Sequence, residues 1–558
     1  MKTIMQWVMA AILISGVSVF TACSSDDDLK KENYVGTSAL VLIAKTGSID
    51  YFQQIESAFR AACQEKGMQA LYYSTSGDNA YEEQVEAIKQ LAEVKDKRIK
   101  GIIYVPCHGL NGESADAVVA AFAKKHDIPV VLLDSKANAN SLARCPFFGT
   151  DNAAAGKAMV NEVKANKVAV FAVKNSPGIE RAEAFKTLKP GADIYPCGEN
   201  ANSDIQAVLS LYDDFVFMNG TPLPAALDML KQAGKNIYTF DIYDEFLDEL
   251  IAGNLKFKGI MAQNTFLMTQ KAVDAALAGT SQGEIVPTFF IDAFTINDDI
   301  VQPYLKFYNK PTAPVIDKLA EKIVGKWMTT DFDGQPELTN NKAVFTFLSA
   351  TQAIVSTSRA DYSAEYEKWA PRLETKVAID GNKVTLTGRP NEHLTVVYGM
   401  NLSSIAAAEM KGIFKVAGFR DGKAVSDDTP HAMCWERITA DYQQAILGIW
   451  EGHVTSDQGS EFDDGEDHRW EYKADGTYVY YRQDKNGEWV DDVNQMAEYF
   501  CDGTLLCTRW KNVGKGAAEN REWWEIESIK DGVMKWTALR QREDGTTYTA
   551  TFQMSKVK

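Results

Sequence analysis

The sequence predicts a multidomain protein with a two-lobed α/β domain followed by two antiparallel β-barrels. Its 558 residues are too many for one hydrophobic core. From Ser38 to about Tyr308, short continuous apolar runs alternate with segments of helical spacing. After Pro314 the helical pattern fades, and short alternating runs separated by Asp-Gly or Gly-Asn turns take over.

The first residues resemble a targeting segment rather than part of a fold. Lys2 precedes an apolar run from Val8 to Phe20, which is too short to span a bilayer as a mature helix. Phe20-Thr-Ala-Cys23 resembles a lipobox, so we predict a lipoprotein signal peptide over 1–22, lipidation of Cys23 and an acidic tether over 23–37. The alternative is a plain secretory cleavage before an incidental cysteine.

Ser24 and the acidic triplet 26–28 resemble the export signal of surface lipoproteins in some Gram-negative bacteria. We therefore expect an outer-membrane lipoprotein at the cell surface. The periplasmic face of the membrane is the alternative location.

The α/β region divides into two series. The first predicts strands at 39–43, 70–73, 101–105 and 128–134, with helices at 51–66, 81–94 and 114–126 between them. The second predicts strands at 168–173, 192–195, 215–218, 237–241, 258–262 and 288–292, with helices at 178–188, 203–211, 224–233, 245–252 and 264–277. Such alternation predicts a doubly wound parallel sheet.

Two of the predicted strands end in an acid, at Asp134 and at Asp241. Ligands of open parallel sheets bind at the carboxyl ends of the strands. We therefore expect two half-sheets that each offer one carboxylate to a shared cleft. The alternative is that each Asp caps the following helix.

Several motifs follow one another between residues 38 and about 308. They are Asp50-Tyr51-Phe52, Leu133-Asp134, Thr150-Asp151-Asn152 with Gly156, Glu180-Arg181-Ala-Glu-Ala-Phe185, Met218-Asn219, Phe240-Asp241 and Ala262-Gln263. In this order they resemble the type I periplasmic sugar-binding proteins, closest to the ribose-binding branch, which shares its fold with the ligand domains of LacI-type repressors. The resemblance implies a flytrap domain over 38–310 that holds a monosaccharide or small sugar-like ligand for a transporter or sensor.

The same resemblance implies the ligand-binding residues. They are Tyr51 and Phe52 as stacking rings, Asp134 and Asp241 as hydroxyl acceptors, Arg181 as a donor, Asn219 as donor and acceptor, and Gln263 near the hinge. It also implies chain crossings between the lobes near Thr150-Asp151, Gln263-Asn264 and Ile291-Asp292. Taken singly, Phe52 could be a core residue, Arg181 a surface residue paired with a glutamate, and Asn219 part of a turn.

The sequence departs from the ribose-binding pattern at several positions. Ser135 stands where that pattern has Arg, and Ile49 replaces an Asn. No aromatic residue lies near Asn200 to Ser203, although Tyr243 could supply a second ring. The resemblance therefore does not imply ribose itself as the ligand.

The region after Pro314 repeats. Ile323-Val-Gly-Lys-Trp327 returns as Ile446-Leu-Gly-Ile-Trp450, and the Asp-Gly turn at 380–381 returns at 502–503. Each repeat has room for about eight short strands, and closure into a barrel would remove exposed edges. The Gly-x-Trp opening resembles lipocalin-like domains of bacterial lipoproteins, which implies two such domains, over 320–440 and 441–558.

Composition bears on several functions. A net charge of −18 argues against a nucleic-acid partner. There are six His and no HExxH or CxxC motif, so no metal or other cofactor is predicted.

No serine nucleophile motif is present, and we predict that the protein is not an enzyme, although paired carboxylates could serve catalysis or binding. The other open alternative is that the barrels bind a glycan or a partner protein, because the second is rich in Trp and Tyr.

Overall fold

The computed structural model describes residues 38–93, 99–109, 111–357, 371–426, 428–456, 466–491, 494–512 and 519–557. The predicted signal peptide, Cys23 and the tether lie outside the described residues. The chain divides into two compact units, the first formed by residues up to Asp248, Lys256–Ile291 and Asp299–Lys310, and the second by Glu249–Leu255, Asp292–Asp298 and Pro311–Lys558. Within the described part of the chain, no helix is both long and apolar enough to cross a membrane.

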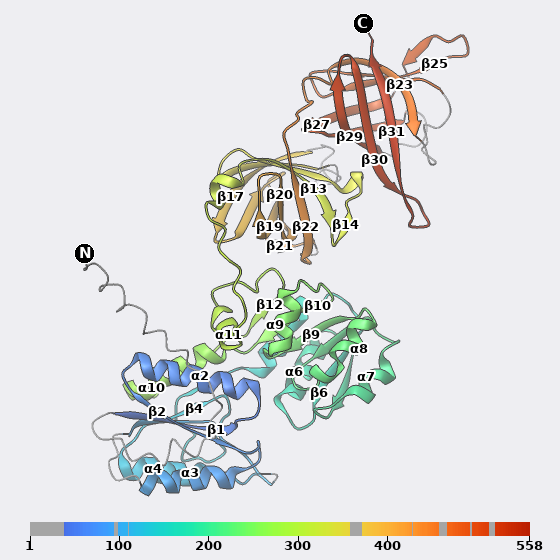
Figure 1. Cartoon of the computed structure of the whole chain (residues 1–558). Helices are drawn as coiled ribbons and strands as arrows, with labels where there is room; N and C mark the ends of the chain where they lie inside the picture. Colours follow the sequence, from blue (N-terminus) through green and yellow to red (C-terminus); the bar gives the residue numbers. More distant parts are fainter. Residues whose placement is uncertain are drawn as a thin grey trace, which may run out of the picture. The chain divides into compact units, whose positions relative to one another are not determined.

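The first unit contains two lobes, each built on a six-stranded sheet (Figure 1). The sheet of the first lobe has the order β11-β5-β4-β3-β1-β2, and all its neighbouring strands are parallel. The elements of this lobe are β1 (Ala39–Thr46), α2 (Asp50–Glu65), β2 (Gln69–Thr75), α3 (Tyr81–Glu93), β3 (Ile99–Tyr104), α4 (Asp116–His126), β4 (Val130–Leu133), β5 (Phe147–Gly149), α10 (Thr265–Ala278) and β11 (Glu284–Ile285).

The second lobe repeats this arrangement with the order β12-β10-β9-β8-β6-β7. Its strands are parallel except β12, which runs antiparallel to β10. The elements are α5 (Asn152–Glu162), β6 (Val168–Val173), α6 (Pro177–Leu188), β7 (Ala192–Cys197), α7 (Asn202–Val208), β8 (Asp214–Phe217), η1 (Pro224–Ala226), α8 (Leu227–Gln232), β9 (Asn236–Phe240), α9 (Asp244–Ile251), β10 (Phe257–Ala262), β12 (Phe289–Ile291) and α11 (Gln302–Phe307).

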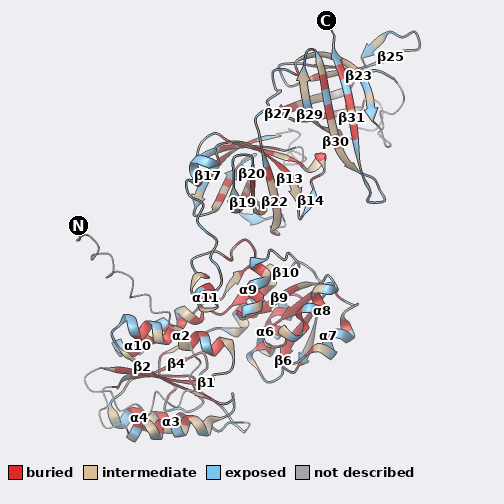
Figure 2. Cartoon of the chain, in the orientation of Figure 1, coloured by how far each residue is buried: buried red, intermediate tan, exposed pale blue. Residues whose placement is uncertain are grey.

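Strand β1 shows why the continuous apolar runs form buried central strands. Leu40 and Leu42 face a core that contains side chains of α2 and α10, whereas Val41 and Ile43 face a second core that contains side chains of α3 and α4. Both faces of the sheet are therefore covered, and Figure 2 shows the central strands as buried. The predicted doubly wound α/β fold is confirmed.

The chain crosses between the lobes three times. Two crossings follow β5 and β10, at Thr150–Asp151 and at Gln263–Asn264. The third joins β11 of the first lobe to β12 of the second, so it lies between Ile285 and Phe289. The crossing that we expected near Ile291-Asp292 thus lies a few residues earlier in the chain, because Phe289–Ile291 is itself a strand of the second lobe.

The second unit begins with a closed barrel. The order is β14-β13-β15-β16-β17-β18-β19-β20-β21, and β22 closes the ring by pairing with both β13 and β20. The elements are α12 (Leu319–Lys322), β13 (Gly325–Phe332), β14 (Gln335–Pro336), η2 (Thr339–Asn341), β15 (Ala343–Phe347), β16 (Gln352–Thr357), β17 (Arg372–Asp380), β18 (Lys383–Gly388), β19 (Leu394–Ile405), β20 (Glu409–Arg420), β21 (Lys423–Ala424) and β22 (His431–Ile438).

The second β domain is a half-barrel, and the antiparallel β architecture that we predicted for both domains is confirmed. Its order is β26-β25-β24-β23-β31-β30-β29-β28-β27, and in the described residues an isolated bridge between Thr477 and Glu498 joins its two ends. Its strands are β23 (Gly448–Ser456), β24 (His468–Tyr472), β25 (Tyr478–Gln483), β26 (Trp489–Asp491), β27 (Asn494–Asp502), β28 (Leu505–Asn512), β29 (Glu519–Lys530), β30 (Val533–Gln541) and β31 (Thr547–Lys556).

Several large aromatic side chains of the half-barrel are buried in its core. These are Trp450, Trp470, Tyr472, Tyr478, Tyr480, Trp524 and Trp536. They pack edge-on or stacked against one another, as in the Trp524–Trp536 pair at 5.2 Å. These side chains are therefore core residues and not part of an outward row, whereas Tyr481, Trp489, Trp510 and Trp523 are partly exposed.

The repeated Ile-x-Gly-x-Trp sequence forms the same local structure in both β domains. The indole Nε1 of Trp327 donates to the carbonyl of Ile323 at 2.7 Å, and that of Trp450 donates to Ile446 at 2.6 Å. Both tryptophans are fully buried. The glycine two residues before each tryptophan has a positive φ, 128° at Gly325 and 113° at Gly448, which favours glycine there.

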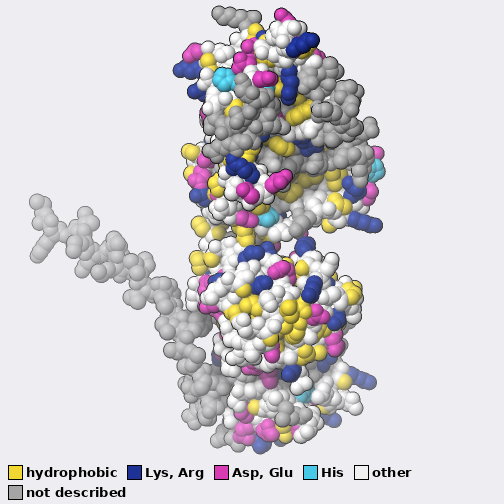
Figure 3. All heavy atoms as spheres, turned by 90° about the vertical axis from the view of Figure 1, so that its right-hand side faces the viewer, with side chains coloured by type: hydrophobic (Ala, Val, Ile, Leu, Met, Phe, Trp, Pro, Cys, Tyr) yellow, Lys and Arg dark blue, Asp and Glu magenta, His cyan; other side chains and the backbone are white. Residues whose placement is uncertain are grey.

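All seven cysteines of the described residues are free. Cys501 pairs with Leu506 across the β27–β28 hairpin, and Cys507 pairs with Phe500. Cys501 and Cys507 therefore do not face each other across this hairpin. On the face shown in Figure 3, acidic and basic side chains are interspersed, and no continuous basic patch is visible.

Candidate functional site

The two strand-end acids have the same backbone conformation in the two lobes. Asp134 follows β4 and Asp241 follows β9, and each has a φ of 64°. Each amide nitrogen donates to the neighbouring strand, to Phe148 at 2.8 Å and to Met261 at 3.1 Å. Aspartate tolerates this left-handed conformation better than most residues. The repeated geometry is the one that the two apolar strands ending in Asp led us to expect.

In the first lobe, both carboxylate oxygens of Asp134 accept hydrogen bonds from neighbouring side chains. Its Oδ1 accepts a hydrogen bond from the Tyr51 hydroxyl at 2.7 Å, and its Oδ2 accepts one from Ser135 at 2.8 Å. The ammonium of Lys45 donates to Ser135 Oγ at 2.6 Å and lies 3.7 Å from Asp134 Oδ2. The carboxylate of Asp134 is therefore held by two hydroxyl groups, those of Tyr51 and Ser135, and by the ammonium of Lys45.

Lys45 is a site residue that the sequence reasoning missed. It is the second-last residue of β1, and so lies at the same edge of the sheet as Asp134. The ribose-binding pattern has an arginine at the position of Ser135. In this chain the positive charge beside Asp134 comes from Lys45 instead. Its ammonium also lies 6.0 Å from the centre of the Phe52 ring. The position at the carboxyl end of a buried strand was the signal that could have revealed it.

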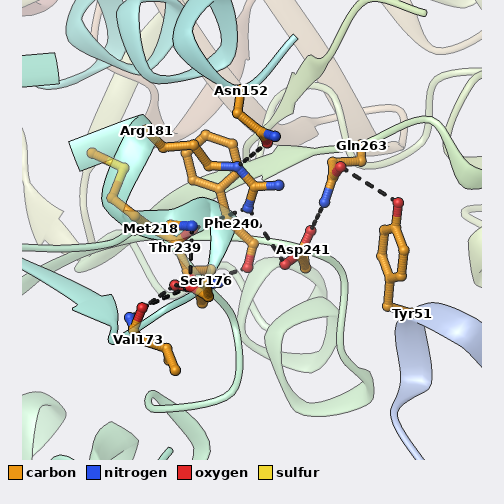
Figure 4. Close-up of polar contacts among 12 residues, drawn as sticks. Tyr51, Asn152, Val173, Ser176, Arg181, Met218, Thr239, Phe240, Asp241 and Gln263 are labelled. Atoms are coloured by element: carbon orange, nitrogen blue, oxygen red, sulfur yellow. Dashed lines mark hydrogen bonds and ion pairs between the residues drawn. The ribbon is translucent and has the colours of Figure 1, made fainter. Parts of the chain in front are cut away.

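In the second lobe, Arg181 is buried and directed at the acid (Figure 4). Its Nε donates to Asn152 Oδ1 at 2.9 Å and one terminal nitrogen donates to the Met218 carbonyl at 3.0 Å. The same nitrogen lies 3.9 Å from Asp241 Oδ2, and the guanidinium covers the ring of Phe240 at 4.6 Å. Arg181 is therefore not a surface residue paired with Glu180 or Glu183.

Asp241 is paired with Gln263 as well as with Arg181. The Gln263 side-chain nitrogen donates to Asp241 Oδ1 at 2.8 Å. Burial raises the pKa of Asp241, and the neighbouring Arg181 acts in the opposite direction. The second lobe thus presents one acceptor group whose charge is balanced by a buried guanidinium.

The two lobes meet at Tyr51. Its hydroxyl, which donates to Asp134 in its own lobe, lies 3.4 Å from the side-chain oxygen of Gln263 (Figure 4). Burial, followed by the charge of Asp134, raises the pKa of Tyr51 far above its ordinary value, so that the hydroxyl is a neutral donor. Asp134, Tyr51, Gln263, Asp241 and Arg181 therefore form one chain of polar contacts from lobe to lobe.

Two predicted residues have other contacts. The side-chain oxygen of Asn219 accepts from the Val173 amide at 3.0 Å and from the Ser176 hydroxyl at 3.2 Å. This oxygen holds the loop before α6, and the binding of a ligand by Asn219 stays a prediction. Phe52 belongs to the core of the first lobe and packs edge-on against Tyr51, with 5.1 Å between ring centres.

Tyr243 lies beside this set of residues. A side chain at Gly220 would collide with its ring, so the ring lies directly against that glycine. Burial raises the pKa of Tyr243, and the charges of Asp241 and Asp50 add to the effect. The tyrosine is therefore placed next to the second acid, where we expected a substitute ring.

The candidate site offers hydrogen-bond acceptors and donors from both lobes. Carboxylates from both lobes are acceptors, and Arg181, Lys45 and Gln263 are donors. This set suits the paired acceptors and donors of vicinal hydroxyl groups, and hydrogen bonds to charged groups are worth about 1.5–3 kcal/mol each. Over the residues that the structure describes, no three His, Cys, Asp or Glu side chains are grouped as a metal site.

Comparison with known proteins gave a family match for the first unit. The family described as "Periplasmic binding protein domain" matches residues 40–283. Comparison with curated protein sequences gave no match.

Solved structures similar to the chain include three sugar-related binding proteins. A solute-binding protein of an ABC transporter from Agrobacterium vitis, bound with α-D-tagatopyranose, is 18% identical, with 48% of this chain and 98% of that chain covered and a TM-score of 0.39. A glucose-galactose-binding protein from Geobacillus stearothermophilus is 21% identical, with 46% and 98% covered and a TM-score of 0.37. The sugar-binding protein of a sugar ABC transporter from Bacillus halodurans is 17% identical, with 48% and 100% covered and a TM-score of 0.40.

Proposed function

We propose that the chain is a non-catalytic binding protein whose first unit captures a monosaccharide or small sugar-like ligand between its lobes, for uptake or sensing. The observation that supports this most directly is the pairing of Asp134 and Asp241, one from each lobe, with donors at the same cleft. The family match over residues 40–283 agrees with it. We further propose that Cys23 is lipidated and anchors the protein in the outer membrane.

A thermal-shift screen of the full chain against monosaccharides, polyols and nucleosides tests the ligand class. A ligand at 100 times its dissociation constant adds about 2.7 kcal/mol of stability. For a unit of this size that raises the melting temperature by about 5 °C or more. A cooperative melt with no shift across the whole panel would contradict the proposed ligand class.

Lys45 gives a second prediction about the site. Replacing Lys45 with Met keeps most of the apolar stem against Phe52 but removes the ammonium that holds Ser135 and Asp134. We expect about tenfold weaker binding of the ligand found in the screen, because one hydrogen bond to a charged group is lost. Titration calorimetry would measure this loss.

The control for Lys45→Met is Lys136→Met. Lys136 is exposed and its ammonium lies over Phe147 at 5.4 Å, so this change alters the net charge equally without removing a contact to Asp134. If the two variants bind the ligand equally well, Lys45 does not belong to the site.

A further inference from the structure

The segment Gln302–Lys310, here called the strap, contacts both lobes and the crossing between them. It comprises α11 and the three residues that follow, and all residues from Pro311 onward belong to the second unit. The buried hydroxyl of Tyr304 donates to the backbone carbonyl of Gln263 at 3.2 Å and lies 3.2 Å from the hydroxyl oxygen of Thr265. The start of the strap is therefore bound to the crossing that carries a site residue.

Tyr308 lies at the end of the strap and bridges the lobes. Its hydroxyl is 3.0 Å from Asp50 Oδ2 on α2, in the first lobe. The same hydroxyl is 2.9 Å from the carbonyl of Ile242, which follows β9 in the second lobe. One oxygen atom can remain within hydrogen-bond distance of both partners only while the lobes keep this separation.

Gln54 strengthens the bridge. This side chain is 1% exposed, and its nitrogen donates to Ile242 at 2.8 Å and to Tyr308 at 2.9 Å. Its oxygen accepts from Thr265 at 3.0 Å. Opening of the lobes would leave several of these buried groups without partners, which is costly. The bridge therefore depends on the arrangement of the lobes in this structure.

The connection between the strap and the first barrel is short. Asn382, in the turn between β17 and β18, donates to the Pro314 carbonyl at 3.0 Å and accepts from the Ile316 amide at 2.7 Å. Only residues 311–313 separate the strap from this clamp. Three residues span at most about 11 Å when fully extended. The strap is therefore joined to the first barrel by a connection of only three residues.

We propose that the strap is a closure sensor, which holds Tyr308 between the lobes when the cleft is closed and passes the change to the first barrel when it opens. This function goes beyond ligand capture, because the β domains would respond to whether the two lobes are open or closed. It depends on movement of the lobes and not on the identity of the ligand.

Hydrogen exchange of the full chain, without ligand, tests the sensor. Tyr308→Phe keeps the ring and removes the hydroxyl that touches both lobes. We expect about fivefold faster exchange in three places: the strap, the amide of Ile316, and the cleft backbone at 134–135 and 263–265. Asp50→Asn should give the same pattern, because it weakens the bridge from the other side.

Lys310→Met is the matched control. Lys310 pairs with Asp244 at 2.8 Å and Asp248 at 2.7 Å, both on α9 of the second lobe, so it connects the strap to one lobe only. Its loss should speed exchange in the strap and leave the cleft unchanged. If Tyr308→Phe gives this same local pattern, or no change, the sensor is rejected. Because no sugar is present, that result is independent of the thermal-shift screen.

Discussion

Replacing Asp241 with Ala is expected to weaken ligand binding by about 100-fold or more while the fold is kept. The carboxylate is largely buried, and its two oxygens face Gln263 and Arg181. A ligand with two hydroxyl groups on this carboxylate would lose two hydrogen bonds to a charged group, each worth about 1.5–3 kcal/mol. Titration calorimetry with the ligand from the screen measures the loss directly.

Two further variants separate this effect from backbone strain. Asp241 has a φ of 64°, so Ala costs about 1–2 kcal/mol there even without a ligand. Asp127→Ala produces the same strain at a φ of 52°, at an exposed position after α4, and should bind normally. Asp241→Asn keeps the shape and tolerates the conformation, so it isolates the loss of charge. Wild-type affinity in a folded Asp241→Ala protein would show that the site is elsewhere.

Replacing Asp502 with Ala is expected to destabilise the second unit by about 3–5 kcal/mol. The side chain of Asp502 is completely buried between the two β domains. Lys326 of the closed barrel bonds one oxygen, Ser356 donates to the other at 2.5 Å, and Arg372 lies 3.8 Å away. Truncation leaves these groups partly desolvated and without their anion.

A small apolar cluster surrounds the same contact between the β domains. Met328 and Val344 of the closed barrel pack with Phe500, Leu505 and Cys507 of the half-barrel. We therefore expect the Asp502→Ala variant to lower the melting temperature of the second unit by about 6–12 °C or more, as measured by calorimetry on the full chain.

Asp441→Ala is the control for the Asp502 prediction. Asp441 binds the same ammonium of Lys326 at 3.0 Å, but its side chain is 43% exposed. An exposed partner of this kind contributes less than about 1 kcal/mol. Equal melting temperatures for the two variants would mean that burial of Asp502 is not what holds the β domains together.

The order and type of the elements in the α/β region followed from the sequence. Continuous apolar runs such as 39–43 and 168–173 became buried central strands, since strands covered on both faces have no polar side to alternate with. The short strands β5 and β11 were not expected, because two or three residues carry no periodicity. Their pairing with the sheet of the first lobe decides where the third crossing falls.

The candidate site was predicted in part. The acids at the ends of β4 and β9 were visible in the sequence because an apolar strand that stops at an Asp is a local pattern. The contacts of Asn219 and Lys45 were not visible, because they join residues far apart in the chain. Their role as ligand-binding residues stays a prediction until the screen and the variants are measured.

The sequence by itself determined the class of each domain, the repeated Ile-x-Gly-x-Trp openings and the two strand-end acids, because each of these depends on residues close together in the chain. The tertiary structure alone decided that an isolated bridge joins the two ends of the second β sheet, that Lys45 accompanies Asp134 and that Tyr308 bridges the lobes. Those features depend on the register of strands and on the distance between side chains up to 258 residues apart, which local patterns of polarity do not encode.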